Sequence, residues 1–510
     1  MVDSFTRTSS IVHRRPHILV CAPSNGAVDN ILRRVVRNGF YQLNGSQYQP
    51  ALVRVGVSDL GDFGSHSEFS AEFKADSLLA MPTEDWIAWL SRQYHTVRAI
   101  ESELAQDLEQ FIALQSTGVM HQSDSLKSKM LHLYEHRDRA VGDLSRLESL
   151  RRYHENTSTS HHDMDRVRIA LEISFVDEAE IVFTTLASSG RKTIKNVTHG
   201  FSNVIVDEAA QSTELSTILP LLTGAKHCIL VGDSQQLPST VLSKVAKEVC
   251  YDRSLFERLI ENGVPSHMLT IQYRMHPHIR QFPSTFFYGG ALTDAASCAK
   301  ERYKLDFVAL SRNNADVTFS PYLVFDTHAG NEERNLNGSI RNNYEATLCM
   351  NLLQLVSHST ERNDSQLSVA VISPYTSHCS LLSELARSLS PRNFELTIST
   401  IDGFQGRESD VVIFSCVRNS QNGLGFLSDA RRLNVALTRA KSALWVLCSR
   451  INSTNAIWNA LLQDAESRKL LVTEAAVEKL NYSMSQQATN DDHAARNTRE
   501  ICDPVLVRNR

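Results

Sequence analysis

The stretch NVIVDEAAQ, residues 203–211, joins a short apolar run to two adjacent carboxylates. An uninterrupted apolar run of this length is typical of a strand covered on both faces, as in a parallel sheet flanked by helices. Runs of the same kind, each ending in small or polar residues, begin at residues 17, 180 and 227, and again at 368, 396, 410 and 443. The sequence therefore predicts an α/β fold with two parallel sheets.

The length and composition agree with a chain of more than one domain. The protein has 510 residues, of which 42% are hydrophobic and 21% charged, as in ordinary globular proteins. Its formal net charge is −5, so binding to a polyanion would need a local basic surface. The nine cysteines are scattered and form no Cys-x-x-Cys pair, which favours reduced thiols without zinc or disulfides. We expect a nuclear protein, with a cytoplasmic one as the alternative, and no membrane segment, since no apolar run reaches roughly 18 residues.

A different kind of sequence lies between the first two runs. Residues 86–153 contain no proline and carry apolar residues at helical spacing. They predict a long helical hairpin inserted into the first sheet domain, with a turn near residues 116–125 and a loop over residues 154–165. The sequence leaves open whether this hairpin is a solvated helix pair or a functional arm.

Asp207 and Glu208 stand at the carboxyl end of the strand predicted from the opening stretch. Nucleotide hydrolysis needs one carboxylate to hold Mg²⁺ and another to orient and deprotonate the attacking water. The pair alone could equally be a solvated helix N-terminus. The run LVGDSQQLP, residues 230–238, favours catalysis because Gln236 would place an amide beside the same strand ends, although alone this run could be a surface turn.

Two arginines are candidates for neutralising the γ-phosphate. In QYRMHP, residues 272–277, Arg274 can meet the charge on a transferring phosphoryl group, and Tyr273 can stack on a base. Arg439, just before the run at residue 443, is a second candidate arginine finger. Arginines from a second domain acting on a phosphate bound by the first would couple hydrolysis to domain closure. A lone Tyr-Arg pair is more often structural, so this cluster counts only together with the others.

A glycine-containing loop follows the run that begins at residue 396. In TIDGFQGRE, residues 400–408, Gly403 and Gly406 let the backbone approach a ligand closely. Glu408 can accept a hydrogen bond from a ribose hydroxyl. The loop is therefore a candidate part of a nucleotide site.

Six segments, in this order, resemble motifs of the superfamily 1B helicases: APSNGAVD, DEAAQ, GDSQQLP, QYRMHP, TIDGFQGRE and LNVALTRAK. The resemblance runs from residue 17 to about residue 450. Within the superfamily, DEAAQSTELSTILPL followed by RSLFERL and QYRMHP is most similar to senataxin-like enzymes, which act on RNA and RNA–DNA hybrids. The resemblance implies ATP and Mg²⁺ as cofactors, single-stranded RNA or DNA and RNA–DNA hybrids as partners, and a monomer.

The resemblance also implies a domain organisation. A RecA-like domain would span residues 1–265, with a small β barrel and a helical stalk inserted over residues 44–165. The run ALVRVG, from Ala51, would belong to the barrel. A second RecA-like domain would span residues 266–470. Few large apolar residues follow about residue 481, and we expect a disordered tail within residues 471–510.

A role follows from the resemblance for each residue of a nucleotide site. Asp207 would hold Mg²⁺ and Glu208 would be the hydrolytic base. The γ-phosphate of ATP would be contacted by Gln236, Arg274 and Arg439. The nucleoside would be met by Tyr273 on the adenine, by Gly406 and by Glu408 at the ribose.

The same resemblance implies which residues contact the nucleic-acid strand. They are Pro23, Ser24, Asn25, Thr184, Thr185, Ser373, Pro374, Tyr375 and Thr400. Most of these contacts would reach phosphate and sugar. Binding should therefore be sensitive to salt and show little sequence preference.

One element of the family is missing from the sequence. No G-x-x-x-x-G-K-[ST] segment and no Gly-Lys dipeptide occurs in the 510 residues. This loop supplies backbone amides for the β-phosphate, a lysine for the β- and γ-phosphates and a hydroxyl for Mg²⁺. We expect an amino-terminally truncated chain with an open apolar edge on its first sheet, which itself hydrolyses ATP negligibly. The alternative is a catalytically inactive nucleic-acid-binding or regulatory protein, whereas a nuclease is disfavoured because no further Asp/Glu/His cluster occurs.

Overall fold

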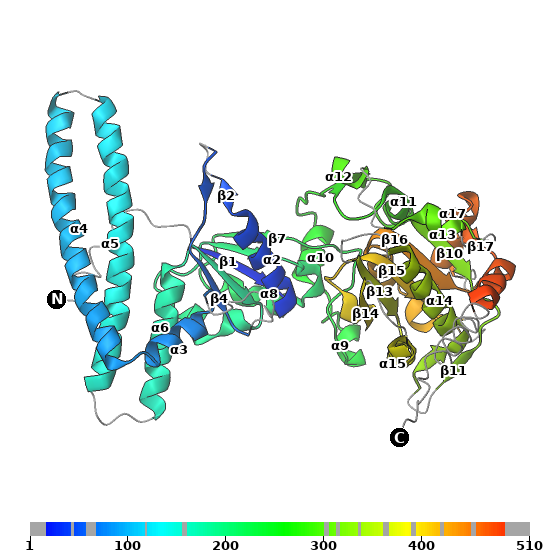
Figure 1. The fold of residues 1–510 in the computed structure, drawn as a ribbon. Coiled ribbons are helices and arrows are strands. Elements are labelled where there is room, and N and C mark those ends of the chain that lie inside the picture. The colour runs from blue at the N-terminus through cyan, green and yellow to red at the C-terminus, as the bar shows by residue number, and fades with distance from the viewer. Residues whose placement is uncertain are drawn as a thin grey trace, which may run out of the picture. The chain divides into compact units, whose positions relative to one another are not determined.

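The computed structural model describes residues 17–41, 45–57, 68–117, 120–155, 161–299, 305–312, 317–334, 338–360, 367–388, 394–418, 423–449 and 455–484. By their contacts the residues form two units (Figure 1). Unit 1 comprises Met1–Ser234 and Pro238–Val264, and unit 2 comprises Gln235–Leu237 and Pro265–Arg510. The sequence places Gln235–Leu237 in the first domain. The structure assigns this segment to unit 2 because Leu237 is buried in an apolar cluster of that unit.

Unit 1 is built on a five-stranded sheet with the order β4-β5-β1-β6-β7. Its strands are β4 (Leu52–Val55), β5 (Ile181–Thr185), β1 (Ile18–Ala22), β6 (Asn203–Val206) and β7 (His227–Leu230). All neighbouring strands run parallel. The apolar runs predicted four of these strands correctly.

Strand β4 is the run ALVRVG, and its assignment to a small barrel is wrong. It pairs in parallel with β5, with Leu52 opposite Ile181 and Val55 opposite Thr184. All four of its residues are buried, including Arg54. A charged residue in a short apolar run suggests a half-exposed strand. Strand β4 can lie within the main sheet because Arg54 is buried together with an anionic partner, Asp29.

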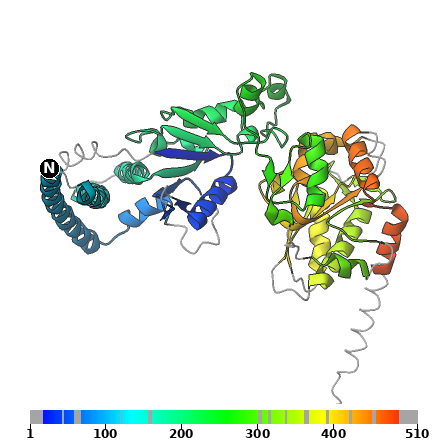
Figure 2. The same ribbon diagram turned by 90° about the horizontal axis from the view of Figure 1, so that it is seen from above.

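Helices cover both faces of this sheet. Alternate residues of β1 point to opposite faces, and they belong to different apolar clusters. Val20 and Ala22 pack with Val28 and Leu32 of helix α2 (Asn25–Asn38), which lies along one face (Figure 2). Leu19 and Cys21 pack on the other face among residues that include Val176, Ile194 and Phe201.

Strand β7 is an edge strand of the sheet, and most of its side chains are exposed. Ile229 and the following Val231 keep 44% and 42% of their surface exposed. An edge strand with exposed apolar side chains is a template for pairing with another strand. Within the described residues, the sheet thus has the open apolar edge that we expect from the sequence.

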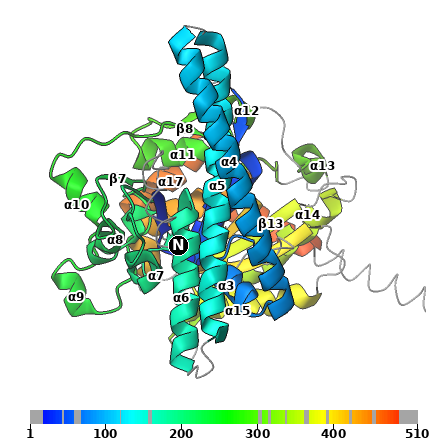
Figure 3. The same ribbon diagram turned by 90° about the vertical axis from the view of Figure 1, so that its left-hand side faces the viewer.

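Long helices form the insertion in unit 1 (Figure 3). They are α4 (Thr83–Thr117), α5 (Met120–Glu155) and α6 (His161–Glu178), preceded by the shorter α3 (Ala71–Leu79). Helices α4 and α5 are antiparallel, since Tyr94 bonds Glu148 while Asp107 bonds Lys129. The hairpin is therefore as predicted, but residues 154 and 155 belong to α5 and residues 161–165 to α6. Of the expected turn over residues 116–125, all but residues 118 and 119 are helical, and these two lie outside the described residues, as do residues 156–160. In the described ranges, no helix is both long and apolar enough to span a membrane.

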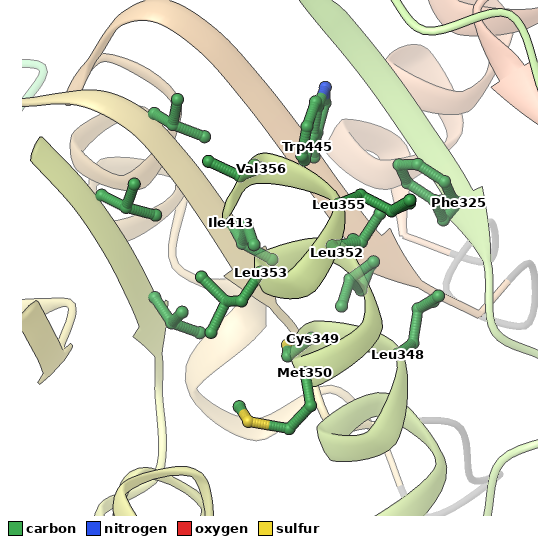
Figure 4. Packing of buried hydrophobic residues seen from close by; sticks show 14 of the residues in the cluster. Phe325, Leu348, Cys349, Met350, Leu352, Leu353, Leu355, Val356, Ile413 and Trp445 are labelled. Carbon is green, nitrogen blue, oxygen red and sulfur yellow. The ribbon is translucent and has the colours of Figure 1, made fainter. Parts of the chain in front are cut away.

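Unit 2 contains a six-stranded parallel sheet with the order β14-β13-β15-β16-β10-β17. The strands are β14 (Phe394–Thr400), β13 (Leu367–Ser373), β15 (Ser409–Ser415), β16 (Ala440–Cys448), β10 (Tyr322–Asp326) and β17 (Leu471–Val472). The first four are the predicted strands, and β10 and β17 were not predicted. Helix α14 (Asn343–Thr360) packs its apolar face on the sheet beside Ile413 and Trp445 (Figure 4).

The predicted disorder of residues 471–510 is wrong for the first part of this segment. Strand β17 pairs with β10, and Val477, Leu480 and Met484 are buried in the core of unit 2. These apolar residues are few, but their helical spacing places them on one face, which is sufficient for packing. Residues 485–510 lie outside the described residues.

Candidate functional site

The predicted catalytic carboxylates follow strand β6 at the carboxyl edge of the sheet of unit 1. The backbone N–H of Asp207 donates to the carbonyl of Cys21 in β1 at 2.8 Å. The N–H of Ala209 donates to the carbonyl of Val231, just after β7, at 2.8 Å. The loops after β1, β6 and β7 therefore meet at one edge, which is where parallel α/β sheets bind their ligands.

Asp207 and Glu208 have different surroundings. Burial raises the pKa of Asp207, against the opposing effects of a backbone hydrogen bond and the charge of Arg34. Glu208 has a φ of 53°, in the left-handed region that non-glycine residues rarely adopt, and its carboxylate accepts a hydrogen bond from the Gln211 amide. One carboxylate thus lies half-buried at the strand end, and the other is carried by a strained turn. The two are suited to different roles.

The half-buried carboxylate fits a magnesium ligand. Nucleotide-bound Mg²⁺ is held by one or two carboxylates together with waters and phosphate oxygens, and Asp207 offers one such carboxylate. The neighbouring loop is packed closely against this turn, because a Cβ on Gly232 would lie 2.9 Å from the backbone nitrogen of Ala210. A side chain at Gly232 would push the loops after β6 and β7 apart.

The predicted strand contacts after β1 lie in a tightly held loop. Ser24 caps helix α2, with its hydroxyl accepting from the N–H of Ala27 at 3.2 Å, and Pro23 precedes it. The Asn25 side-chain oxygen accepts from the guanidinium of Arg54 at 2.9 Å. Arg54 in turn pairs with Asp29 at 3.0 Å, and both side chains are 1% exposed. Sequence reasoning missed this buried pair, whose only signal was a charged residue within an apolar run.

The two threonines after residue 183 differ in what they can offer a strand. The Thr184 side chain is fully buried, and its hydroxyl donates to the carbonyl of Val55 at 3.0 Å. A nucleic-acid contact through this side chain does not fit the geometry, because the hydroxyl is used to hold β4. Thr185, also buried, is the last residue of β5 and accepts from the N–H of Ser188 at 3.2 Å.

In unit 2, four predicted residues lie around the end of helix α16 (Ala430–Leu437). Arg439 donates through Nη2 to the Gln236 side-chain oxygen at 3.1 Å. Arg274 donates through Nε to Glu408 at 2.7 Å and through Nη1 to the carbonyl of Thr438 at 3.1 Å. Because Thr438 and Arg439 are consecutive, the two guanidinium groups share one turn of the chain. The structure thus places Gln236, Arg274 and Arg439 around one turn of unit 2, whereas the sequence predicts Gln236 beside the strand ends of the first domain. Their contact with a γ-phosphate stays a prediction.

Glu408 is the anion of this cluster. It pairs with Lys441 at 2.9 Å as well as with Arg274. Burial alone would raise the pKa of Glu408, but the hydrogen bonds and charges of Lys441 and Arg274 outweigh it and lower the pKa to about 2. The carboxylate is therefore ionised at neutral pH and engaged with two cations, so its contact with a ribose stays a prediction. Lys441 was not singled out by the sequence, where it looks like an ordinary strand residue.

Tyr273 and Gly406 lie on loops beside this cluster. The side chain of Gln272 accepts hydrogen bonds from the N–H groups of Arg274 and Met275 at 2.8 Å and 2.7 Å, which fixes the turn that carries Tyr273. Tyr273 itself is 73% exposed, so its ring can be stacked on. Gly406 has a φ of 74°, a conformation that a residue with a side chain rarely adopts.

The predicted strand contacts of unit 2 lie at the carboxyl edge of its sheet. Ser373 and Thr400 are register partners at the ends of β13 and β14. The buried Ser373 hydroxyl has no hydrogen-bond partner among the described residues, and the Thr400 hydroxyl accepts from the N–H of Gly403 at 3.1 Å. Pro374 and the buried Tyr375 follow directly after β13.

Comparison with known proteins agrees with these observations. Models of two AAA-domain families match residues 2–244 and 251–451. A probable helicase of Dictyostelium discoideum is 34% identical over 459 residues, which cover 89% of this chain and 40% of the relative. Helicase sen1 of Schizosaccharomyces pombe is 35% identical over 91% of this chain and 27% of its own length. Probable helicase senataxin of Homo sapiens is 31% identical over 90% of this chain and 17% of its own length. The chain thus spans less than half the length of these relatives.

Proposed function

We propose, on the premise that the chain belongs to the senataxin-like helicases of superfamily 1B, that it is the strand-gripping part of an ATP-dependent helicase acting on RNA or RNA–DNA hybrids. The observation that carries the proposal is the cluster in unit 2, where Gln236, Arg274 and Arg439 gather around the end of one helix. Such a cluster can meet the charge of a transferring phosphoryl group. We also propose that the protein is nuclear and monomeric.

Each residue has a role in this proposal. Bound MgATP would supply the γ-phosphoryl group whose transfer to water drives movement along a strand. Asp207 would hold the metal, and Glu208 would orient the attacking water and take its proton. Arg439 and Arg274 would stabilise the charge on the γ-phosphate, with Gln236 aligned by its bond to Arg439.

The predicted contacts with a nucleic-acid strand, here called the strand grip, give the most direct test. We expect the full chain to bind single-stranded RNA and DNA with little sequence preference. The logarithm of the binding constant should fall linearly with the logarithm of salt concentration, by about 0.7 for each phosphate contact neutralised. Fluorescence anisotropy of labelled oligonucleotides over a KCl series measures this slope, with an RNA–DNA hybrid and a duplex as comparisons. Binding that does not respond to salt, or that requires one sequence, would contradict the proposed grip.

ATP turnover gives a second test. The 510 residues contain no phosphate-binding loop, and this loop supplies most contacts to the β-phosphate. We expect the chain to release no phosphate from ATP above the buffer rate, with or without RNA. The matched control is Glu208→Gln, which separates this chain from a contaminating ATPase. RNA-stimulated release that is lost in Glu208→Gln would show that the chain hydrolyses ATP without the loop.

A non-catalytic nucleic-acid-binding or regulatory protein is the second candidate. It is supported by the same missing loop together with the position of the predicted strand contacts Ser373 and Thr400 at one edge of the sheet of unit 2. The two candidates differ in their response to nucleotide. Once a phosphate-binding loop is supplied by fusion at the amino terminus, a motor core should change its affinity for a single strand when ATP and Mg²⁺ are added, whereas a simple binding protein should not.

A further inference from the structure

An exposed aromatic ring lies beside the predicted strand contacts of unit 2. Phe426 belongs to the short 3-10 helix η6 (Gly425–Ser428), and 53% of its surface is exposed. Its ring centroid is 6.0 Å from that of the buried Tyr375, in an edge-to-face arrangement. An exposed phenylalanine is common on its own, so its surroundings decide whether it can bind a ligand.

The ring of Phe426 is held in a fixed position. The guanidinium of Arg432 lies over it, 5.1 Å from the ring centroid. Arg432 is itself held by Asp402 at 3.2 Å and by Asp429 at 3.0 Å. On the other side of Phe426 in the chain, Gly425 has a φ of 53°, and a Cβ there would lie 3.4 Å from the Tyr375 hydroxyl. A ring that its neighbours already order loses little conformational entropy when it binds a partner.

The elements that hold this ring also carry predicted strand contacts. Tyr375 follows β13, and Asp402 lies two residues after Thr400, at the end of β14. Since Ser373 and Thr400 are register partners, both loops leave the sheet at the same edge. Phe426 therefore lies next to the place where the sugar–phosphate backbone of a strand is expected.

We propose that Phe426 is a stacking platform for one unpaired base of a single-stranded RNA or DNA, an inference that rests on the proposed strand grip. Stacking on an aromatic ring tolerates every base, because each base has a π-face. A base inside a duplex has no free face, so the ring would favour single strands. Arg432 acts as a positioning residue, because it contacts the ring and is held by two carboxylates.

Binding of the full chain to a single-stranded oligonucleotide tests this role. We expect Phe426→Leu, which keeps an apolar side chain but removes the ring, to weaken binding by about tenfold. Phe426→Tyr and Phe426→Trp keep the ring and should bind nearly as wild type. The matched control is Phe286→Leu, the same change at a phenylalanine on helix α11 (Pro277–Phe287) that is 40% exposed. It should leave the affinity unchanged.

Two further measurements make the test specific. Abasic sites placed one at a time along the strand should remove the difference between wild type and Phe426→Leu at one position only. The fluorescence of 2-aminopurine placed at that position of the strand should be quenched when wild-type protein binds. This measurement needs no variant, so it does not depend on how well a variant folds. Equal binding by Phe426→Leu and wild type, or no quenching at any position, would overturn the stacking role while leaving the strand grip intact. A wild-type chain that binds no single strand would overturn both.

Discussion

Arg54→Ala should lower the free energy of unfolding of unit 1 by about 3–5 kcal/mol, because it removes one partner of a buried ion pair. Arg54 and Asp29 are each 1% exposed and lie 3.0 Å apart. Arg54 also donates to the carbonyls of Val55 and Val57 and to the side chain of Asn25. Its loss would therefore remove one buried ion pair and the donor of several hydrogen bonds, and would also release the loop after β1.

Hydrogen exchange in β1 and β5 measures this effect, because a chain of two units has no single unfolding transition. The matched control is Arg168→Ala, which breaks an exposed pair with Asp76 in the same unit, whose side chains are 41% and 52% exposed. That change should cost no more than about 1 kcal/mol. The double variant Arg54→Met, Asp29→Asn buries no charge and should recover much of the loss. If the amides of β1 are protected from exchange equally in Arg54→Ala and Arg168→Ala, the buried pair does not stabilise unit 1.

The same arginine shows where the sequence stops predicting the fold. A strand that is covered on both faces has an uninterrupted apolar sequence. Eight such runs correctly predicted eight strands, namely β1, β5, β6, β7, β13, β14, β15 and β16. Strand β4 breaks that rule because its arginine is neutralised by Asp29 on a neighbouring helix, a partner that spacing along the chain does not reveal. Strand β17 has two residues, which is too short for a periodic pattern.

For the candidate site, the sequence predicts which residue types are present better than it predicts their hydrogen-bond and ion-pair partners. The chemistry of phosphoryl transfer selects arginines, carboxylates and an amide, and the structure brings Arg274, Arg439 and Gln236 together. Hydrogen-bond partners depend on the path of the loops. For that reason Gln236 belongs to unit 2, and Glu408 is held by Arg274 and Lys441. Phe426 was missed because an isolated aromatic residue after a glycine has no motif of its own.

Glu345→Ala should destabilise unit 2 by about 2–4 kcal/mol, because it leaves buried donors without an acceptor. The fully buried Glu345 carboxylate accepts hydrogen bonds from the Ser415 hydroxyl, the Val417 N–H and the Thr327 hydroxyl, at 2.5 Å, 2.8 Å and 2.9 Å. Val417 has a φ of 69°, which a β-branched residue adopts only when its surroundings impose it. Removing the carboxylate therefore also releases a strained turn.

A neighbouring histidine fixes the direction of these bonds. The N–H of Asn342 donates to Nδ1 of His378, so the ring carries its proton on Nε2 and donates it to the Ser415 hydroxyl at 2.9 Å. Burial lowers the pKa of His378 to about 4, which keeps the ring neutral. The Ser415 proton is then free to point at Glu345. Glu345→Gln can keep the same acceptor and turn its amide toward Thr327, so we expect it to recover most of the stability lost in Glu345→Ala.

A comparison of the pH dependence of stability in wild type and in Glu345→Gln separates the effect of the charge of Glu345 from that of its shape. Burial raises the pKa of Glu345 to about 7, against the effect of its hydrogen bonds. The folded chain therefore holds this proton at a pH where the unfolded chain, with a pKa of about 4.3, has released it. The stabilising effect of the bound proton is complete below the unfolded pKa and is lost as the pH rises through about 7. His378 contributes in the opposite direction between its folded and unfolded pKa values, but it is present in both proteins and cancels in their difference. Chemical unfolding of unit 2 between pH 5 and pH 8 should thus show wild type losing stability relative to Glu345→Gln, and a constant difference would mean that Glu345 stays ionised when buried.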